Sequence, residues 1–395
     1  MNVDFLYGIL GLGFWGYVLV AVISVQITIV CVTVYLHRDA AHRAVDLHPA
    51  LRNFARFWIW FTAGMLTREW VAVHRKHHAK CETADDPHSP VIYGLKKILL
   101  EGAELYQVQA RDVANLEKYG RGTPDDWLER HLYTKHRNWG IIAIVILDLL
   151  LFGAPGIIII AIQMLAMPLL AAGVINGLGH HSGYRNFECP DAATNIVPWG
   201  IVLGGEELHN NHHAFPSSAK FSVRRWEFDS GWFWIKLFSA LGLAKVNRVA
   251  PTPVVQPQRK HIDLETVRAV ITNRMHVLRN YTMQVTLPVW RAEFKRAGRQ
   301  LHGSVKKLLI REPMLLDASA KSQLQLVLAQ HQILNTVYES RERLRQLWAG
   351  HVISNEHLVN NLKEWIAQAE SSGIQSLQEF AAKLRSYAMA PTLAT

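Results

Sequence analysis

The chain has 395 residues, half of them hydrophobic, and carries a formal net charge of +10. Its mean hydropathy is only +0.05, so the apolar residues must be gathered in segments rather than spread through an ordinary soluble core. The cysteines, Cys31, Cys81 and Cys189, match neither a zinc-binding spacing nor a disulfide framework, which argues against a secreted disulfide scaffold and indicates a reducing environment. A basic chain suits nucleic acid or an anionic lipid surface, and the apolar segments favour lipid and argue against nucleic acid.

The first apolar segment, residues 5–36, contains no charged side chain. About 20 apolar residues suffice to cross a bilayer, so this segment is long for one helix and short for two. Glycines near its start leave two interpretations open, one long tilted span or a short hairpin. No basic residue precedes it, so we expect a retained membrane anchor rather than a cleaved signal peptide.

Residues 50–72 interleave aromatic residues with arginines, which is typical of a helix lying in the membrane interface. Residues 91–138 are polar and predicted to be helical. A second apolar run, 141–176, is interrupted by a turn at 153–156, which predicts a helical hairpin. Its first arm carries Asp148, which we expect to face protein or water because an ionisable group in lipid is costly.

Three prolines after residue 250 predict a linker over 251–259. Residues 260–395 carry apolar residues at helical spacing without a span-length run, which predicts a helical cytoplasmic extension. Four roles remain open for this extension: holding the partner protein, holding the polar end of a substrate, contacting a second copy of the chain, or only stabilising the cytoplasmic face, which is slightly favoured. The predicted fold is all-α: a membrane unit over 1–250, with two apolar hairpins or three to four spans and a cytoplasmic helical cap, followed by the linker and the extension.

Four short stretches rich in histidine lie beside or at the ends of the apolar segments. Their candidate metal ligands are His37, His42, His74, His77, His78, Asn176, His180, His209, His212 and His213. Histidines three or four residues apart share one face of a helix, and a separation of five fits the end of a helix. Nine imidazoles exceed the needs of one metal and fit two, with Asn176 holding a metal-bound water. Imidazole suits zinc, copper, iron and nickel, and two metals in a nitrogen shell at a membrane surface favour iron and oxygen chemistry.

Arginine and lysine are dense around the first two stretches. The positive-inside rule therefore predicts that the metal face lies in the cytoplasm.

The sequence resembles the membrane fatty-acyl desaturases over residues 5–250. The resemblance is carried by His37-x-x-x-x-His42, by Glu69-Trp70 with His74-Arg-Lys-His77-His78 and Asp86-Pro-His88, by Asn176-x-x-x-His180, and by Gly205-Glu-Glu-Leu-His209-Asn-Asn-His212-His213 with Trp226-Glu-Phe-Asp229. It is closest to bacterial stearoyl-type delta-9 desaturases. The resemblance implies two non-haem iron ions held by the nine histidines, molecular oxygen as co-substrate, and a cis double bond placed mid-chain in a long-chain acyl substrate. It also implies a bacterial inner-membrane location and a separate electron donor, such as ferredoxin and its reductase.

Two features depart from the family pattern. Ala72-Val73 stands where many members that use acyl-CoA carry a charged pair, so acyl-CoA and acyl-lipid both remain open as substrates. The extension after residue 260 is absent from animal members and resembles the tail of some proteobacterial ones.

Further residues near the histidines are candidates for supporting roles. Carboxylates expected to orient imidazole N–H groups are Asp86, Asp191, Glu206 and Glu207. Tryptophans that either line the substrate tunnel or pack at the interface, with packing favoured, are Trp70, Trp199 and Trp226. Basic residues that either meet a phosphate-bearing head group or face solvent or lipid are Arg75, Lys76, Arg224 and Arg225. We interpret His48, His88 and His181 as structural.

Two rival functions remain open. A membrane hydroxylase or ketolase shares the same metal chemistry and inserts oxygen instead of removing hydrogen. A metal transporter requires ionisable ligands within the spans, where Asp148 is nearly alone. Chain length, double-bond position and oligomeric state are not fixed by the sequence.

Overall fold

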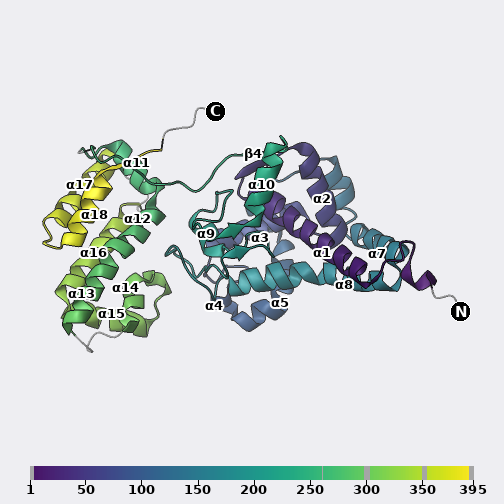
Figure 1. Cartoon of the computed structure of the whole chain (residues 1–395), viewed down its shortest axis with the longest axis horizontal. Helices are drawn as coiled ribbons and strands as arrows, with labels where there is room; N and C mark the ends of the chain where they lie inside the picture. The colour runs from purple at the N-terminus through teal and green to yellow at the C-terminus, as the bar shows by residue number, and fades with distance from the viewer. Residues whose placement is uncertain (1–3, 260, 298–302, 349–353, 391–395) are drawn as a thin grey trace. The chain divides into compact units, whose positions relative to one another are not determined.

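The computed structural model describes residues 4–259, 261–297, 303–348 and 354–390. These residues are mostly helical and divide into two compact units (Figure 1). The first unit comprises Met1–Arg185 and Ala192–Ala250, and the second comprises Asn186–Asp191 and Pro251–Thr395. The chain therefore passes from one unit to the other at residue 250, where the sequence predicts a domain boundary, but a six-residue segment before it also belongs to the second unit.

The first unit is built from helices joined by short connections. Its helical elements in chain order are η1 (Asp4–Tyr7), α1 (Phe14–Val30), η2 (Cys31–Ala41), α2 (Pro49–Ala63), α3 (Thr67–Lys80), α4 (Pro90–Tyr93), α5 (Leu95–Ala110), α6 (Val113–Tyr119), η3 (Glu129–Tyr133), α7 (Trp139–Phe152), α8 (Ala154–Met167), η4 (Pro168–Leu178), α9 (His209–Ala214) and α10 (Ser230–Ala240). Its strands are β1 (Val45–Leu47) paired antiparallel with β4 (Ala244–Val246), and β2 (Trp199–Gly200) paired parallel with β3 (Phe228–Asp229).

Two helices of the described chain are long and apolar enough to cross a membrane, Phe14–Ala41 and Ala154–Leu178. The first joins α1 to η2 without a break, so the apolar run at the N-terminus forms one long helix instead of a hairpin. The second joins α8 to η4 and is preceded by the shorter apolar helix α7, which forms the other arm of the expected hairpin. The described chain thus supplies two full-length candidate spans where three or four were expected.

The aromatic segment 50–72 forms two helices instead of the single interfacial helix expected. Gly64 ends α2 in a left-handed conformation with a φ of 60°, which glycine adopts without a steric penalty. The turn redirects the chain into α3, which carries the second histidine stretch.

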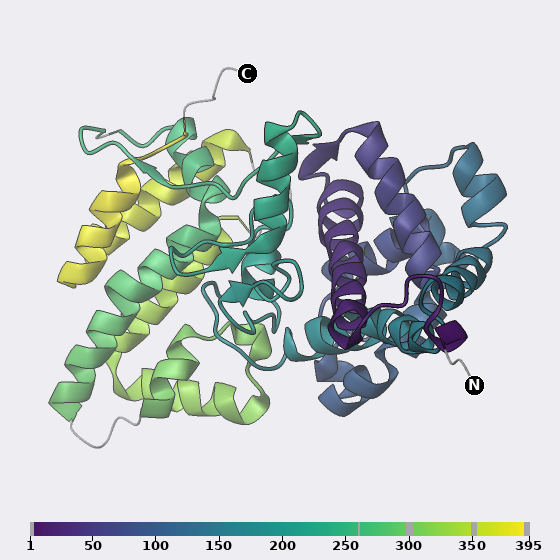
Figure 2. The same cartoon turned by 45° about the vertical axis from the view of Figure 1, so that its right-hand side comes forward.

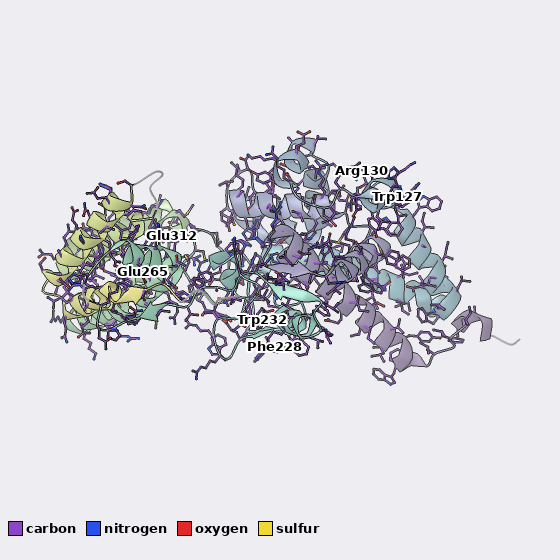
Figure 3. The ribbon with its side chains drawn as sticks, turned by 90° about the horizontal axis from the view of Figure 1, so that it is seen from above. Trp127, Arg130, Phe228, Trp232, Glu265 and Glu312 are labelled. Atoms are coloured by element: carbon purple, nitrogen blue, oxygen red, sulfur yellow. The ribbon has the colours of Figure 1, made fainter. Side chains whose placement is uncertain are left out.

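Several large aromatic side chains of the first unit are exposed, as expected of a chain that meets the membrane interface. Trp127 and Phe228 are 68% and 44% exposed and project outward in Figure 3. Asp148, by contrast, is buried in protein within α7, as the sequence predicts.

The second unit is a helical bundle with its own hydrophobic core (Figure 2). Its helical elements are α11 (Leu264–Thr272), α12 (Arg274–Tyr281), η5 (Thr282–Thr286), α13 (Leu287–Ala297), α14 (Gly303–Ile310), η7 (Pro313–Leu315), α15 (Ala318–Gln330), α16 (Gln332–Gln346), α17 (Asn355–Glu370) and α18 (Gln375–Arg385). Tyr281, Trp365 and Phe380 pack edge to face at the centre of this core. The proline-rich linker contributes β5 (Val254–Val255), which pairs antiparallel with β6 (Tyr387–Ala388), so the linker forms part of the second unit.

Candidate metal centre and adjoining cavity

The first histidine stretch lies on a π-helix. In η2 the backbone N–H of His42 donates to the carbonyl of His37, five residues earlier. This wider turn brings residues five apart onto one face, and the two imidazole rings lie 5.0 Å apart. From the sequence we attribute the five-residue spacing of His37 and His42 to the end of a helix. In the structure, a π-helical turn brings the two residues together.

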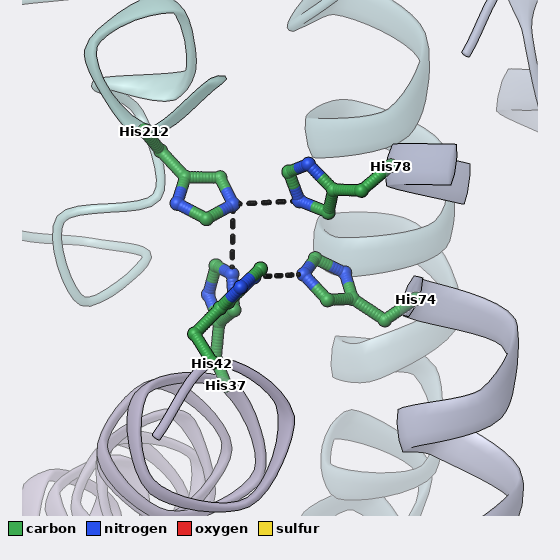
Figure 4. A group of neighbouring side chains, drawn as sticks. All are labelled: His37, His42, His74, His78 and His212. Atoms are coloured by element: carbon green, nitrogen blue, oxygen red, sulfur yellow. Dashed lines mark hydrogen bonds between the residues drawn. The ribbon is translucent and has the colours of Figure 1, made fainter. Parts of the chain in front are cut away.

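Five histidines from three separate segments meet in one place, which we call the five-histidine cluster (Figure 4). Its members are His37, His42, His74, His78 and His212. Their Nε2 atoms converge: His37 to His212 is 3.0 Å, and the separations His42–His74 and His78–His212 are both 2.8 Å. The arrangement joins the end of the first long helix, the middle of α3 and the short helix α9.

The four remaining candidate histidines form a second group, the four-histidine cluster. Its members are His77, His180, His209 and His213. The Nε2 atom of His180 lies 3.1 Å from that of His77 and 2.9 Å from that of His209, which in turn lies 3.1 Å from that of His213. The two clusters adjoin, because the rings of His78 and His213 stack with centroids 4.5 Å apart. The structure thus brings all nine predicted histidines together as two neighbouring sets of nitrogen donors.

Three carboxylates orient rings of the two clusters by bonding the ring nitrogen that faces away from the cluster. Glu206, Asp86 and Glu82 accept from the Nδ1–H groups of His37, His77 and His180 at 2.7, 2.9 and 2.9 Å. Each bond directs the opposite nitrogen, Nε2, toward the cluster. The expectation for Asp86 and Glu206 is therefore confirmed, whereas Glu82 was not predicted, although it follows the second histidine stretch by only four residues.

The same carboxylates have perturbed pKa values. Burial raises the pKa of Glu206 to about 8. Asp86 is also buried, which favours its neutral form, but His77 and the backbone N–H of His88 outweigh burial and hold its pKa below its usual range. Burial raises the pKa of Glu82 as well, yet the Ser89 hydroxyl and the N–H of Ala192 both donate to it and favour the carboxylate.

The donor set fits a metal cation. Burial lowers the pKa values of His74, His78, His180, His209 and His212 well below the usual value, so these imidazoles are neutral. With its Nδ1–H committed to Glu82, His180 presents a bare Nε2 lone pair to two other ring nitrogens. A cation that accepts the Nε2 lone pairs of a whole cluster satisfies these nitrogens together, and imidazole is a preferred donor for iron, zinc, copper and nickel.

A cavity of about 420 Å³ opens beside both clusters. His37, His74, His77 and His209 contribute to its wall together with Asn176, and much of the remaining wall is apolar. The apolar lining residues include Val32, Met65, Val73, Met164, Met167 and Ile175. The Glu69–Arg137 ion pair also lines the cavity, as does the half-buried Tyr106. A cavity of this volume and character suits an apolar ligand with a polar end.

Of the tryptophans and carboxylates predicted to support the site, some lie in it and others lie elsewhere. Trp70 lines the cavity and stacks on His74 at 4.8 Å, whereas Trp199 and Trp226 are 64% and 56% exposed and do not line it. Glu207 accepts from the N–H groups of Leu203 and Gly205, not from a histidine, so the expectation for it is wrong.

The remaining candidates are placed as follows. Asp191 is buried in the segment grouped with the second unit, and its supporting role stays a prediction. Arg75 donates to backbone carbonyls and Lys76 to Gln109, while Arg225 is exposed. His48 accepts from the N–H of Ala50 at the start of α2, and His181 is exposed, in keeping with their exclusion from the ligand set.

Besides Glu82, two further features of the site were missed from the sequence. His88, interpreted as structural, is 5% exposed, lines the cavity and stacks on His77 at 4.5 Å. Arg38 is fully buried and joins the first histidine stretch to the chain around the third, by an ion pair with Asp229 at 2.9 Å and a cation–π contact with Phe221 at 3.8 Å. Arg38 and Asp229 lie 191 residues apart, so no local pattern reveals their pairing.

Fold and site together define a helical protein with two helices apolar and long enough to cross a membrane and with histidine clusters that could hold metal ions beside an apolar cavity. A family model described as fatty acid desaturase matches residues 12–236, more than half of the chain and including all nine histidines. The chain belongs to the fatty acid desaturase family, whose members are oxidoreductases acting on fatty acyl lipids.

Curated relatives agree with this assignment. "Delta-9 acyl-lipid desaturase 1" of Arabidopsis thaliana is 29% identical over 235 residues, covering 58% of this chain and 74% of the relative. The "sn-1 stearoyl-lipid 9-desaturase" of Synechocystis sp. is 31% identical over 229 residues, covering 56% and 68%. A relative named as an acyl-CoA 5-desaturase, from Anemone leveillei, is 29% identical over 231 residues, covering 54% and 65%. A model described as transposase matches residues 263–390, which lie in the second unit and make up less than half of the chain.

Proposed function

We propose that this protein is an oxygen-dependent acyl desaturase that places a cis double bond at the delta-9 position of a long acyl chain, with two iron ions in its histidine clusters. The observation that carries the proposal is the convergence of nine imidazoles in two adjoining sets on the wall of an apolar cavity. A mid-chain methylene carries no polar group that an enzyme could bind. The enzyme must therefore position it through the fit between the acyl chain and an apolar cavity beside the reacting centre.

The five-histidine cluster would hold one iron and the four-histidine cluster the other, with Asn176 on the cavity wall placed to hold a water. When bound, the two irons supply the oxidising power needed to remove hydrogen from an unactivated methylene. The protein itself positions the ligating nitrogens. Three carboxylates fix three of the rings so that each Nε2 faces its cluster: Asp86 fixes His77, Glu82 fixes His180 and Glu206 fixes His37.

The cavity residues would position the acyl chain. Trp70 is held by its stacking on His74 and presents a rigid aromatic wall beside the five-histidine cluster. Val73 and Ile175 carry apolar side chains on the same wall, which exclude water from the chain and align it with the clusters. The cis geometry and the delta-9 position would follow from where the cavity bends the chain past the histidines.

We favour an acyl lipid as substrate, because two of the relatives are named as acyl-lipid and stearoyl-lipid desaturases. We further propose that the protein resides in the bacterial inner membrane with the clusters at the cytoplasmic face. Arginines and lysines gather around the first two histidine stretches, which supports this orientation.

The test compares two adjacent histidines in a host that lacks delta-9 desaturation. His180→Ala removes a ring at the centre of the four-histidine cluster, whereas His181→Ala alters an exposed ring that bonds Ser182. Lipids are extracted and the double bond is located by mass spectrometry. We expect the wild type and His181→Ala to yield a delta-9 alkene, and His180→Ala to yield at least 100-fold less product because the cluster is broken.

Other outcomes identify the alternatives. A hydroxylated chain without an alkene would establish the hydroxylase in place of the desaturase. Near-normal alkene from His180→Ala would contradict the nine-ligand centre. Product found on acyl-CoA before any lipid would replace the acyl-lipid substrate, and an iron content other than two per chain would contradict the metal assignment.

A further inference from the structure

Cys81 is the residue that follows α3, and its thiol lies beside the four-histidine cluster. Cys81 is four residues beyond His77, so the two residues share one face of the helix. The same spacing relates His74 to His78, which belong to the five-histidine cluster. The end of α3 therefore presents one pair of metal-binding side chains to each cluster.

The thiol of Cys81 is within reach of an ion held by the histidines beside it. Its Sγ atom lies 3.8 Å from Nε2 of His77 and 4.0 Å from Nδ1 of His180. Zinc binds sulfur at about 2.3 Å and imidazole nitrogen at about 2.0–2.1 Å, so a sulfur and a nitrogen on one tetrahedral ion are about 3.6 Å apart. The distance from Sγ to Nε2 of His77 is close to that separation.

Four residues can each offer one donor atom such that all four atoms lie within 4.8 Å of one another: His77, Cys81, His180 and His213. We call this set the Cys-His₃ site. A tetrahedral zinc ion would draw its donors to about 3.3–3.6 Å, and closed zinc sites are almost always four-coordinate. The set therefore completes the shell of a zinc ion without His209. Because His180 is 99 residues from Cys81, the spacing of the cysteines alone does not reveal the site.

Two of the three imidazoles present the nitrogen that such an ion needs. His77 and His180 donate their Nδ1–H groups to Asp86 and Glu82 at 2.9 Å each. A neutral imidazole carries one ring hydrogen, so the Nε2 atom of each of these rings offers a lone pair. The two Nε2 atoms lie 3.1 Å apart, and a cation is a partner that both can bind at once.

The turn that carries Cys81 is held firmly by the next residue, Glu82. Glu82 has a φ of 61°, a left-handed conformation that residues with a Cβ rarely adopt. Hydrogen bonds hold it there: its N–H donates to Asp86 at 2.9 Å, and its carboxylate accepts from the Ser89 hydroxyl and from the N–H of Ala192. Cys81 is thereby fixed beside the four-histidine cluster.

The Cys-His₃ site borders solvent as well as the cavity. Cys81 and His213 are half-buried and lie outside the cavity wall, whereas His77 is buried and lines the cavity. An ion at this site is therefore not enclosed by the acyl-binding cavity alone.

We propose that the Cys-His₃ site binds zinc, and that zinc bound there excludes iron from the four-histidine cluster. The exclusion of iron rests on the proposed function, whereas zinc binding itself does not. Binding forms a Zn–S bond and releases the thiol proton to solvent, and no oxidation state changes. Thiolate is a softer ligand than imidazole and selects zinc, so the two clusters differ in metal preference because the five-histidine cluster contains no cysteine.

The test uses the full-length, iron-free protein in detergent, loaded with zinc chloride and measured by X-ray absorption at the zinc edge. Cys81→Ser keeps a hydrogen-bonding group of similar size and removes the sulfur. The control Cys31→Ala removes a thiol that is buried in the hydrophobic core of the first unit. We expect the wild type and the control to show sulfur at about 2.3 Å beside nitrogen at about 2.0–2.1 Å, and Cys81→Ser to show nitrogen alone.

Zinc affinity and iron retention are two further readouts. We expect Cys81→Ser to weaken zinc binding at this site by about 10-fold or more, as judged by competition with a chromogenic chelator. When the iron-loaded protein is incubated with zinc, the wild type and Cys31→Ala should lose iron from one of the two clusters. Cys81→Ser should retain that iron.

Three outcomes would overturn the Cys-His₃ site: a nitrogen-only shell in the wild type, loss of the sulfur shell in Cys31→Ala, or equal zinc affinity in the wild type and Cys81→Ser. Iron retained by the wild type in the presence of zinc would overturn the exclusion of iron.

The proposed function is tested separately, by giving the iron-loaded wild type a reductant, oxygen and acyl lipid. Alkene formation together with a nitrogen-only zinc shell would leave the desaturase intact while the zinc site fails. If no alkene forms although zinc binds through Cys81, the desaturase fails while the zinc site holds.

Discussion

The carboxylates behind the histidines determine which ring nitrogen faces each cluster. Asp86 is the clearest case, because it accepts from His77 and from the N–H groups of Glu82 and His88. It therefore fixes a ring and the turn that follows α3 at the same time. Asp85, its neighbour, is exposed and pairs only with Lys80, which makes it a matched control.

Asp86→Asn keeps the shape of the side chain and removes the charge that orients His77. We expect iron affinity to fall about 10- to 100-fold, as is typical when the partner of a ligating histidine is lost. Asp85→Asn should leave affinity unchanged. Iron retention against a graded chelator checks both variants, and equal retention by the two would contradict the role of Asp86.

The buried imidazoles also predict how the iron-free protein responds to acid. The pKa values of His74, His78, His209 and His212 are lowered in the folded state by burial. The unfolded chain therefore binds more protons below about pH 6.5, and stability is lost as the pH falls through that value. Glu206, with its pKa raised to about 8, acts in the opposite sense, as do other carboxyls whose pKa values burial raises, namely Glu69, Glu82, Glu129, Glu207 and Glu312. The buried imidazoles with lowered pKa values are more numerous, so we expect them to set the direction of the change.

The direction in which stability changes with pH is tested by measuring the thermal midpoint of the apoprotein in detergent from pH 8 to pH 5. We expect a plateau above about pH 7 and a decline below about pH 6.5. A midpoint that rises on acidification would show that the carboxyl groups dominate.

At the scale of the element, one buried ion pair connects the first long helix to the start of α10. Arg38 and Asp229 have fully buried side chains, and Asp229 also accepts from the N–H groups of Phe221 and Trp232. This connection holds His37 and His212, from opposite ends of the first unit's sequence, within one cluster.

Asp229→Asn leaves the Arg38 charge buried without a partner. We expect a loss of about 3–5 kcal/mol of stability, the usual cost of breaking a buried pair, together with loss of iron from the five-histidine cluster. Asp125→Asn, in the exposed pair with Arg130, should leave the midpoint and the iron content unchanged. Similar midpoints for the two variants would contradict the structural role of the Arg38–Asp229 pair.

Local pattern accounts for what could be predicted from the sequence. Helical spacing and the ends of apolar runs were sufficient to place nine histidines and Asn176 in one site. The assignment of His77 and His78 to different clusters could not be read from spacing, because adjacent residues point about 100° apart on a helix and the sequence does not show what each one meets. Glu82 and the Arg38–Asp229 pair were missed because their partners lie 98 and 191 residues away. The break at Gly64 was missed because an isolated glycine is also tolerated within a helix.

At the scale of the whole molecule, the two units have separate cores and different sources of stability. The described residues place all nine candidate histidines in the first unit, while the second unit is held by a core around Tyr281, Trp365 and Phe380. Metal binding therefore contributes free energy to only one of them.

Calorimetry of the loaded protein should show two transitions. Chelation of iron should lower only the first unit's transition, by several kcal/mol if the metal is bound tightly. Leu362→Ala, which creates a cavity in the second core, should lower only the other transition, by about 2–5 kcal/mol. A shift of both transitions in either experiment would show that the units unfold as one.

The segment Asn186–Asp191 has a consequence for how the protein is made. It belongs to the second unit and contains the buried residues Phe187 and Cys189, but it emerges from the ribosome between two parts of the first unit. At about 5–20 residues per second, the rest of the second unit follows on the order of tens of seconds later. During that interval Phe187 and Cys189 are synthesised but the rest of their own unit is not. A nascent chain stalled near residue 250 would therefore be a substrate for chaperones, and the protein cannot be shortened cleanly by a single cut.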